Sequence, residues 1–294
     1  MTAAINERTI IDASRRFIPE TLTPLFFTTA YGDLTGAQRL RYNQLHACYF
    51  CEQTIFFEQR LGRPVLTALA AIAPSDSLQH MIRCFLDEEN EHSAMFRRLL
   101  CLSTPQLYRN SVFFFIRPHP VWAKALAWVA CRPRLFPMLI WLQLLQEERA
   151  MHFSKCFLTE GEMLEPEFLA AQRKHLSDEI DHIRWDHELL DWLWPSTSHW
   201  WRIVNAKLFC WMVREFFYTP KRAGVRVVEH LVQEFPELRF MLPRLKKEML
   251  GLAANPTYLR SLYSEKIAPN SYEHLRIYPE FSKLTTILPE FNYA

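Results

Sequence analysis

Glycine is scarce in this chain, which contains only 6 glycines among 294 residues. Tight turns, β-hairpins and phosphate-cradling loops depend on glycine, because it adopts positive φ without steric cost. The scarcity therefore argues against β-rich folds and nucleotide-binding loops, and it predicts an all-α protein. The 18 prolines then mark helix starts and corners between helices.

The sequence also lacks an excess of charge of either sign, with 34 Lys and Arg against 32 Asp and Glu. This balance provides no overall basic field, so we expect no nucleic-acid partner. Long uncharged apolar runs are missing too. The most apolar stretch, 121–145, is interrupted by Lys124, Arg132 and Arg134. It predicts a buried core helix and no membrane span, which needs about 18 apolar residues.

A secretory signal is not apparent, since residues 1–15 are polar and charged. The seven cysteines are an odd number, and the one Cys-x-x-Cys pair, Cys48 and Cys51, has no second pair to complete a zinc site. We therefore expect a cytoplasmic protein whose thiols are reduced and buried.

Four long helices are predicted, and no linker or compositional break divides the chain, so we expect residues 1–294 to form one domain. Two hairpins joined by one long crossover are typical of ferritin-like four-helix bundles. Residues 35–195 would form this core. Residues 196–294 would add C-terminal helices to the bundle, near 198–218, 221–234 and 237–253, as a cover that ends in an irregular tail; further N-terminal helices are also expected. The four helices are expected at 35–61, 77–100, 136–158 and 166–194, with corners at 74–76 and 159–162 and a crossover at 102–135.

Three residues with metal-binding side chains, His175, Glu179 and His182, share one side of the fourth helix. At about 100° per residue, Glu179 lies roughly 40° from His175, and His182 lies roughly 20° away on the other side. The Glu-x-x-His half of this pattern occurs earlier, as Glu89 and His92. Two such motifs, with single glutamates on two further helices, are typical of a dimetal carboxylate site inside a bundle.

Hairpin geometry selects the two single glutamates, because residues equidistant from a corner lie opposite each other. Glu58 and Glu89 are 31 residues apart and centred on the first corner; Glu148 and Glu179 are also 31 apart and centred close to the second. We therefore predict Glu58 and Glu148 as ligands.

Two neighbouring glutamates are rivals for these positions. Glu52 points to the opposite side of its helix from Glu58 and would face the site if the corner fell about three residues earlier. Glu147 faces about 100° away from the stripe formed by Leu145, Glu148 and His152.

The predicted set of four glutamates and two histidines can hold two iron or manganese ions, with open positions for O₂. His175 adds an imidazole where the first half has Phe85, so we expect two inequivalent metals and entry on the less crowded side. Glu88 and Asp178 each precede a ligand glutamate and could accept the distal N–H of a ligand histidine on a neighbouring helix. A single Glu-x-x-His motif commonly lies on a solvent-exposed helix face. Two matched motifs in apolar helices would leave buried charges without a partner unless they bound metal.

With these motifs the chain resembles the p-aminobenzoate N-oxygenase family of diiron enzymes over about residues 35–195. The resemblance implies a monooxygenase that activates O₂ at a reduced diiron centre. It would oxygenate a small-molecule amine through hydroxylamine and nitroso stages toward a nitro compound. The sequence has no flavin or nicotinamide fingerprint, so the electrons would come from a separate reductase, as an external donor, or from the substrate itself. The ligands it implies are Glu58, Glu89, His92, Glu148, His175, Glu179 and His182.

Two other functions stay open on the sequence alone. The first is a diiron oxygenase that performs C–H hydroxylation, desaturation or oxidative cleavage on a carrier-bound substrate; Lys221, Arg222 and Arg226 could bind an acidic carrier protein. The second is a ferritin-like iron-binding protein without an organic substrate. The sequence does not decide the substrate, the electron donor, iron against manganese, or whether the chain forms a homodimer.

Overall fold

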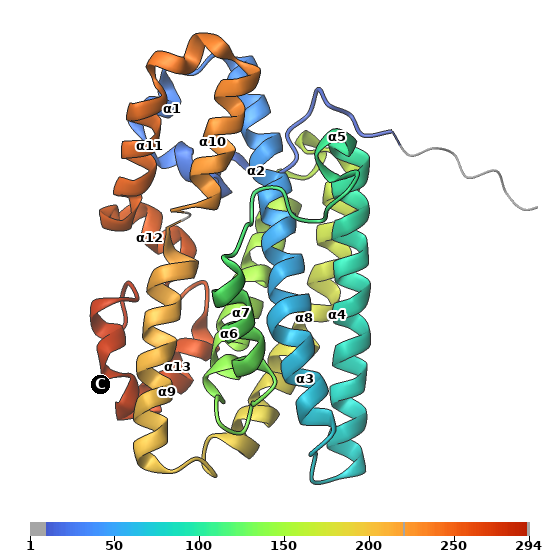
Figure 1. The fold of residues 1–294 in the computed structure, drawn as a ribbon, viewed down its shortest axis with the longest axis vertical. Helices are drawn as coiled ribbons and strands as arrows, with labels where there is room; N and C mark the ends of the chain where they lie inside the picture. The colour runs from blue at the N-terminus through green and yellow to red at the C-terminus, as the bar shows by residue number, and fades with distance from the viewer. Residues whose placement is uncertain (1–9, 220, 293–294) are drawn as a thin grey trace, which may run out of the picture.

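Helices make up the regular structure of this protein in the computed structural model, which describes residues 10–219 and 221–292 (Figure 1). Within these residues β-structure is limited to one isolated bridge between Arg16 and Leu164. The all-α prediction is therefore confirmed.

Four long helical rods lie side by side along the long axis of the molecule (Figure 1). They form two hairpins, and the crossover between the hairpins carries two short helices, as in ferritin-like bundles. The rods are α2 (Gly36–Phe57) continued through η3 (Glu58–Gly62) into α3 (Arg63–Ala70), α4 (Asp76–Ser103), α7 (Met138–Glu160) and α8 (Pro166–Leu193); the crossover helices are α5 (Pro105–Tyr108) and α6 (Pro120–Ala130).

Local chemistry fixes where these rods begin. The Thr35 hydroxyl accepts the Gln38 N–H, and the Gln38 side chain accepts the Thr35 N–H, so the two residues form a capping box at the start of α2. The Ser75 hydroxyl accepts the Leu78 N–H at 3.2 Å and caps α4. Gly161 ends α7 with a φ of 46°, a conformation that favours glycine. Both hairpin corners therefore lie where the sequence predicted them.

The first rod is longer than expected, because Pro64 does not end it. Proline lacks an N–H and its ring crowds the carbonyl four residues earlier, here that of Arg60. A π-helical turn at Glu58–Gly62 accommodates the proline ring and the missing N–H, and the helix continues as α3 to Ala70. Such turns are rare and frequently occur at functional sites. This one begins at the candidate ligand Glu58.

The cover packs against the bundle on the left side of Figure 1, where α9 and α13 contact α7. Near the N-terminus, α1 (Thr29–Gly32) is short and contacts the cover helix α11. The tail is more regular than predicted, because it contains α12, α13 and a 3-10 helix. The cover elements are α9 (His199–Met212), η5 (Val213–Tyr218), α10 (Ala223–Glu234), α11 (Leu242–Gly251), α12 (Pro256–Leu262), α13 (Pro269–Ile277) and η8 (Pro279–Thr286).

Because the cover lies on its outer side, α7 is enclosed between two layers. Every residue from Met138 to Glu148 is buried. Trp141 shows how the layers meet: its ring packs edge-on against Trp194 of the α8 C-terminus and Phe281 of the tail. α7 therefore has two buried faces, one toward the bundle interior and one toward the cover.

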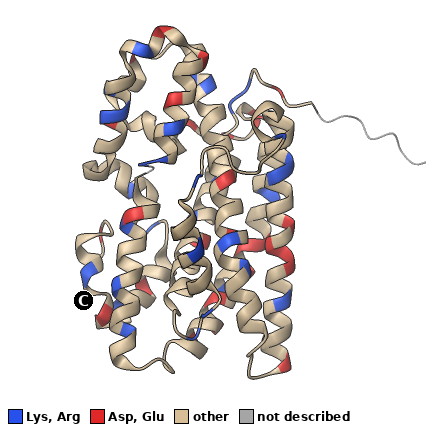
Figure 2. Ribbon diagram, in the orientation of Figure 1, with Lys and Arg blue, Asp and Glu red and all other residues tan. Residues whose placement is uncertain are grey.

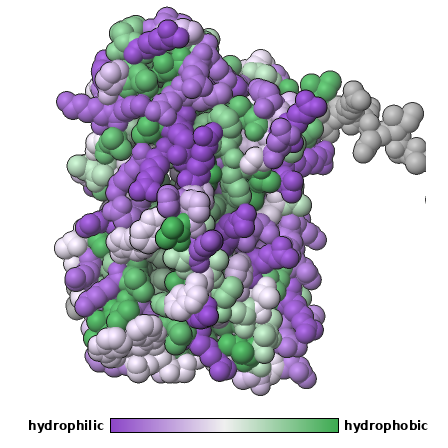
Figure 3. Space-filling view, viewed as in Figure 1, coloured by the Kyte–Doolittle hydropathy of each residue, from purple (hydrophilic) through white to green (hydrophobic). Residues whose placement is uncertain are grey.

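Charged residues of both signs are interspersed over the helices in view, with no face of a single sign (Figure 2). Apolar side chains reach the surface on the same face (Figure 3), and exposed ones on α6, α9 and η5 include Trp122, Trp211 and Phe216. None of the helices in the described part of the chain has the length and apolar content needed to cross a bilayer. All seven cysteines are free, but Cys101 and Cys131 are exposed, so the expectation that every thiol is buried was wrong.

Candidate metal centre

Seven buried residues of the four rods bring metal-binding atoms together in three overlapping groups. Within each group the donor atoms lie within 4.8 Å of one another. His92 and His182 each belong to two groups, so the three groups form one continuous centre. The groups are Glu58, His92 and His175; Glu89, His92 and His182; and Glu147, Glu179 and His182.

Six of the seven predicted ligands lie in this centre, but Glu148 does not. Its carboxylate points to the cover, where it accepts hydrogen bonds from the backbone N–H of Asn270 (2.9 Å) and Ser271 (2.7 Å) and from the Asn270 side chain (2.8 Å). These N–H groups belong to the first turn of α13, whose positive end a carboxylate stabilises. Glu147 takes the place in the centre that was predicted for Glu148.

Of the two alternative ligands on the first rod, Glu58 faces the centre and Glu52 does not. Glu52 is fully buried and accepts the Tyr108 hydroxyl at 2.7 Å, together with three consecutive backbone N–H groups of the crossover (residues 114–116) at 2.7–3.0 Å. Glu58 instead lies 3.9 Å from His175 Nε2 and accepts the Ser93 hydroxyl at 2.5 Å. Glu52 therefore fixes the crossover, and Glu58 faces the centre as predicted.

Two histidines are oriented by carboxylates on opposite rods. His92 Nε2 lies 2.9 Å from Asp178, and His182 Nε2 lies 3.0 Å from Glu88. The carboxylates hold the proton on Nε2, and the Nδ1 atoms are buried without a hydrogen-bond partner among the described residues. Each Nδ1 then carries a lone pair that can bind a metal in the centre. The predicted pairing of Glu88 and Asp178 with ligand histidines is present in the structure.

His175 lies in the same centre and presents its other nitrogen. Its Nε2 is 2.7 Å from one Glu179 oxygen, while the two Glu179 oxygens lack hydrogen-bond geometry to any described residue. The Phe96 ring meets His175 edge-on with a centroid separation of 5.3 Å, and Phe85 stacks on His182 at 4.2 Å. Apolar rings therefore close the centre around converging donor atoms.

The electrostatics of the centre favour bound cations, because burial disfavours the ionised form of several of its carboxylates. Burial raises the pKa of Glu58 and Glu147 well above the usual range, with neighbouring carboxylates adding to the effect, and it raises the pKa of Glu89 to about 7. Burial alone would also raise the pKa of Glu179, but the charge of the adjacent His175 holds this pKa well below normal. Four ionised carboxylates carry a charge that two divalent cations balance. Carboxylate oxygens and imidazole nitrogens are ligands suited to iron or manganese. The residues present therefore fit a dimetal centre.

Asp186 is a further buried carboxylate, which the sequence analysis did not include among the candidate ligands. It lies one turn beyond His182, and both of its oxygens are buried without a hydrogen-bond partner in the described ranges. Burial raises its pKa well above normal. The four-residue spacing from His182 was a signal that could have placed it on the inner side of α8.

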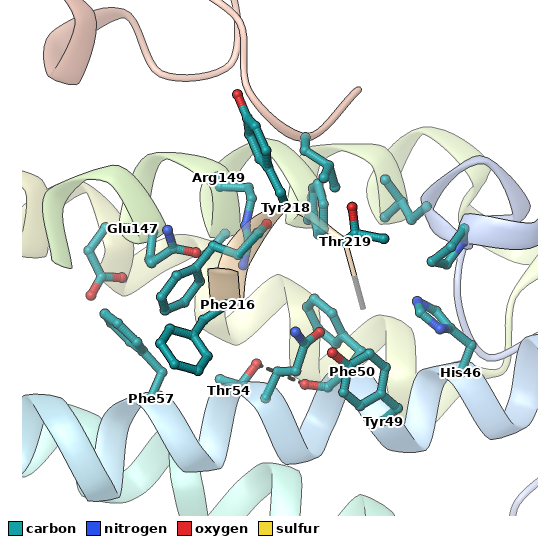
Figure 4. A pocket seen from close by; sticks show the side chains of 18 of the residues that line it. His46, Tyr49, Phe50, Thr54, Phe57, Glu147, Arg149, Phe216, Tyr218 and Thr219 are labelled. Atoms are coloured by element: carbon teal, nitrogen blue, oxygen red, sulfur yellow. Dashed lines mark hydrogen bonds between the residues drawn. The ribbon is translucent and has the colours of Figure 1, made fainter. Parts of the chain in front are cut away.

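A cavity of about 110 Å³ lies beside the centre, between α2 and α7 (Figure 4). Three candidate ligands line one end of it: Glu58, Glu147 and His175. Aromatic rings form much of the wall; they belong to Tyr49, Phe50, Phe57, Phe153, Phe216, Phe217, Tyr218 and Tyr258.

Arg149 is the cation of this cavity, and no carboxylate pairs with it in the described part of the chain. Its Nη1 donates to the Tyr263 hydroxyl at 2.8 Å, and its guanidinium lies over the Phe153 ring, 5.6 Å from the centroid. A half-buried guanidinium without a counter-charge is suited to an anionic or carbonyl group of a ligand.

The family described as P-aminobenzoate N-oxygenase AurF matches residues 6–237 of the chain, most of its length. The chain belongs to the p-aminobenzoate N-oxygenase family. The matched region contains all seven residues of the centre, and the predicted resemblance is confirmed. Membership of this family implies an oxygenase with a diiron centre, and the buried histidine and glutamate groups are compatible with it. A search of curated proteins finds no match.

We expect Asp178→Asn to weaken metal binding by about 10–100-fold, because a neutral amide is a weaker acceptor for the N–H of His92 Nε2 than a carboxylate. Iron affinity, measured by competition with a chelator, is the test. Asp181→Asn on the same helix is the matched control, since the Asp181 side chain is half-exposed and forms an ion pair with exposed Arg184 at 3.0 Å. Equal iron affinity in the two variants would show that Asp178 does not orient the histidine.

Proposed function

We propose that this protein binds two iron ions and uses O₂ to oxygenate the nitrogen of an aromatic amine whose other end carries an acid or acyl group. The cavity carries this proposal, because it joins candidate ligands, aromatic walls and an unpaired guanidinium in one space. The electrons come from a separate donor.

The metal ligands in this proposal are the seven residues that converge in the structure. His92 and His182 would bind through Nδ1, the nitrogen left free by their carboxylate partners. His175 would bind through Nε2, which faces Glu179 and Glu58. Glutamates 58, 89, 147 and 179 complete the set, with Glu147 in place of Glu148. When bound, the two irons would supply the positions and the electrons for O₂ activation.

The residues of the cavity do the remaining work of binding and orientation. Stacking between Phe57 and Phe153 would hold an aromatic ring and exclude water. Arg149 would bind the acid or acyl group and so direct the amine toward Glu58 and Glu147. An apolar wall disfavours an ammonium ion, so the amine would bind neutral with its lone pair available for oxygenation.

The test is a single turnover of iron-loaded protein. We expect about two irons per chain and, after chemical reduction and exposure to O₂, conversion of 4-aminobenzoate to its hydroxylamino, nitroso or nitro product. Arg149→Gln should keep the iron and lower the affinity for 4-aminobenzoate more than tenfold, because charge-assisted hydrogen bonds are lost. Its affinity for aniline, which has no acid group, should be unchanged.

Three outcomes would contradict the proposal. One iron per chain would exclude a dimetal site. Oxygenation at carbon would favour the hydroxylase alternative. Iron oxidation without any amine product, for every amine tried, would favour the iron-binding alternative.

A further inference from the structure

The cavity continues well beyond the length of a small aromatic amine. Its α2 wall is formed by residues at positions 46, 49, 50, 53, 54, 57 and 58, which is one face of the helix over three turns. At 1.5 Å per residue, the levels of Glu58 and His46 are about 18 Å apart along the axis. Figure 4 shows Glu147 at one end of the cavity and His46 at the other.

Arg149 divides this length unequally. In Figure 4 it lies across the cavity from Thr54. Thr54 is only about 6 Å from the level of Glu58 along the helix, close to the separation of the amine and carboxyl groups of 4-aminobenzoate. About 12 Å of wall, from Thr54 to His46, then remains on the far side. A compact amine held by Arg149 would leave that part of the cavity empty.

The far part contains buried polar atoms without a hydrogen-bond partner among the described residues. His46 is 5% exposed, its Nδ1 is buried, and its ring has no hydrogen-bond partner among the described residues. The Thr219 hydroxyl, 3% exposed, is likewise unpartnered, and both side chains line the cavity. Leaving such a group unsatisfied costs about 1–3 kcal/mol. Because both side chains line the far part of the cavity, a polar ligand group bound there would complete their hydrogen bonds.

The chemistry of these side chains restricts that group. Burial lowers the pKa of His46 to about 3, so the imidazole stays neutral near pH 7. A neutral imidazole donates with one nitrogen and accepts with the other, and a threonine hydroxyl does both. The matching group is neutral and both donates and accepts, such as a hydroxyl or an amide.

We propose that His46 and Thr219 form a second subsite, which binds the neutral polar tail of an elongated aromatic amine. In such a substrate the amine would lie at the carboxylate end, an acyl group at Arg149 and the tail at His46. This inference rests on the proposed function for the position of the amine, but tail binding itself does not require metal.

The experiment compares two 4-aminobenzamides that differ in one atom group: one carries an N-butyl chain and the other an N-(4-hydroxybutyl) chain. Their affinities for the metal-free protein are measured by calorimetry. We expect the hydroxybutyl compound to bind about tenfold more tightly, as one hydrogen bond to a buried partner predicts. His46→Phe and the isosteric Thr219→Val should each bring this ratio toward one, whereas His46→Gln should retain most of it.

The control is His187→Phe, because the Nδ1 of His187 is also unpartnered among the described residues but the side chain lies outside the cavity lining. It should leave the ratio unchanged. Equal affinities of the two amides for the parent protein would overturn the inference. So would a protein that binds 4-aminobenzoate but neither of the two amides. The proposed function fails in a different way, namely if amines bind but none is oxygenated at nitrogen.

Discussion

Glu147→Gln should lose at least one of two irons per chain, whereas Glu148→Gln should keep both irons and destabilise the fold. The two residues are adjacent and both buried, so the pair is matched in position and size. Glu147 lies with Glu179 and His182 in the centre, where an amide cannot supply the missing negative charge. Glu148 accepts three hydrogen bonds from the first turn of α13.

The expected cost of Glu148→Gln is about 2–4 kcal/mol, because charge-assisted bonds at a helix N-terminus become weaker neutral ones. Metal analysis and thermal unfolding of the iron-free proteins separate the two effects. The reverse pattern, with iron lost from Glu148→Gln and retained by Glu147→Gln, would restore the ligand predicted from the sequence.

A similarly large contrast is expected for the pair Glu52 and Glu58. Glu52→Gln should destabilise the protein by about 3–5 kcal/mol, since its carboxylate satisfies a buried hydroxyl and three backbone N–H groups of the crossover. Iron binding should persist once the variant is folded. Glu58→Gln should lose iron.

The pH dependence distinguishes the two variants further: burial raises the pKa of both glutamates, but hydrogen bonds from the crossover and Tyr108 oppose the rise at Glu52, whereas the pKa of Glu58 is raised well above normal. Burial raises the pKa of Glu58 well above normal, so folding of the iron-free protein disfavours its ionised form. That penalty is absent at pH 4 and grows as the pH rises above the unfolded value of about 4.5. Iron-free Glu58→Gln should therefore be at least as stable as the parent at pH 8. Denaturant unfolding of both iron-free variants at pH 8 is the measurement, and a Glu58→Gln protein less stable than Glu52→Gln would refute this assignment.

Helix periodicity and the first hairpin corner were enough to predict part of the centre from the sequence, whereas the second hairpin offset selected Glu148 in place of Glu147. Helix period alone places His175, Glu179 and His182 on one side, and the corner near residue 73 selects Glu58 over Glu52. Ser75 and Gly161 mark these corners with recognisable capping chemistry. The two acidic neighbours of the ligand glutamates could also be found, because a ligand histidine needs a partner for its distal N–H.

Glu148 was misplaced because the hairpin offset does not separate adjacent residues, and because the apolar stripe of α7 was taken to face the bundle interior. That argument holds for a helix with one buried face. α7 is buried on two, and the stripe that includes Leu145 and Glu148 faces the cover. Nothing in α7 itself shows which face meets the metals, since the partner of Glu148 lies more than 120 residues later.

The continuation of the first rod was missed for a local reason. Pro64 is compatible both with a helix end and with a π-helical turn that accommodates it. Only the packing of α3 against α4 decides between them, and it favours continuation to Ala70.

The contact between Glu148 and α13 has a consequence for any shortened form of the protein. Asn270 and Ser271 lie beyond residue 237, where the family match ends. A fragment ending at that point would leave a buried carboxylate without its hydrogen bonds, directly beside Glu147. In such a fragment the Glu148 carboxylate would compete with Glu147 for the cations that the centre is proposed to bind, or α7 would rotate about its axis. The tail outside the matched region thus holds the Glu148 carboxylate on the cover side of α7, away from the candidate metal centre.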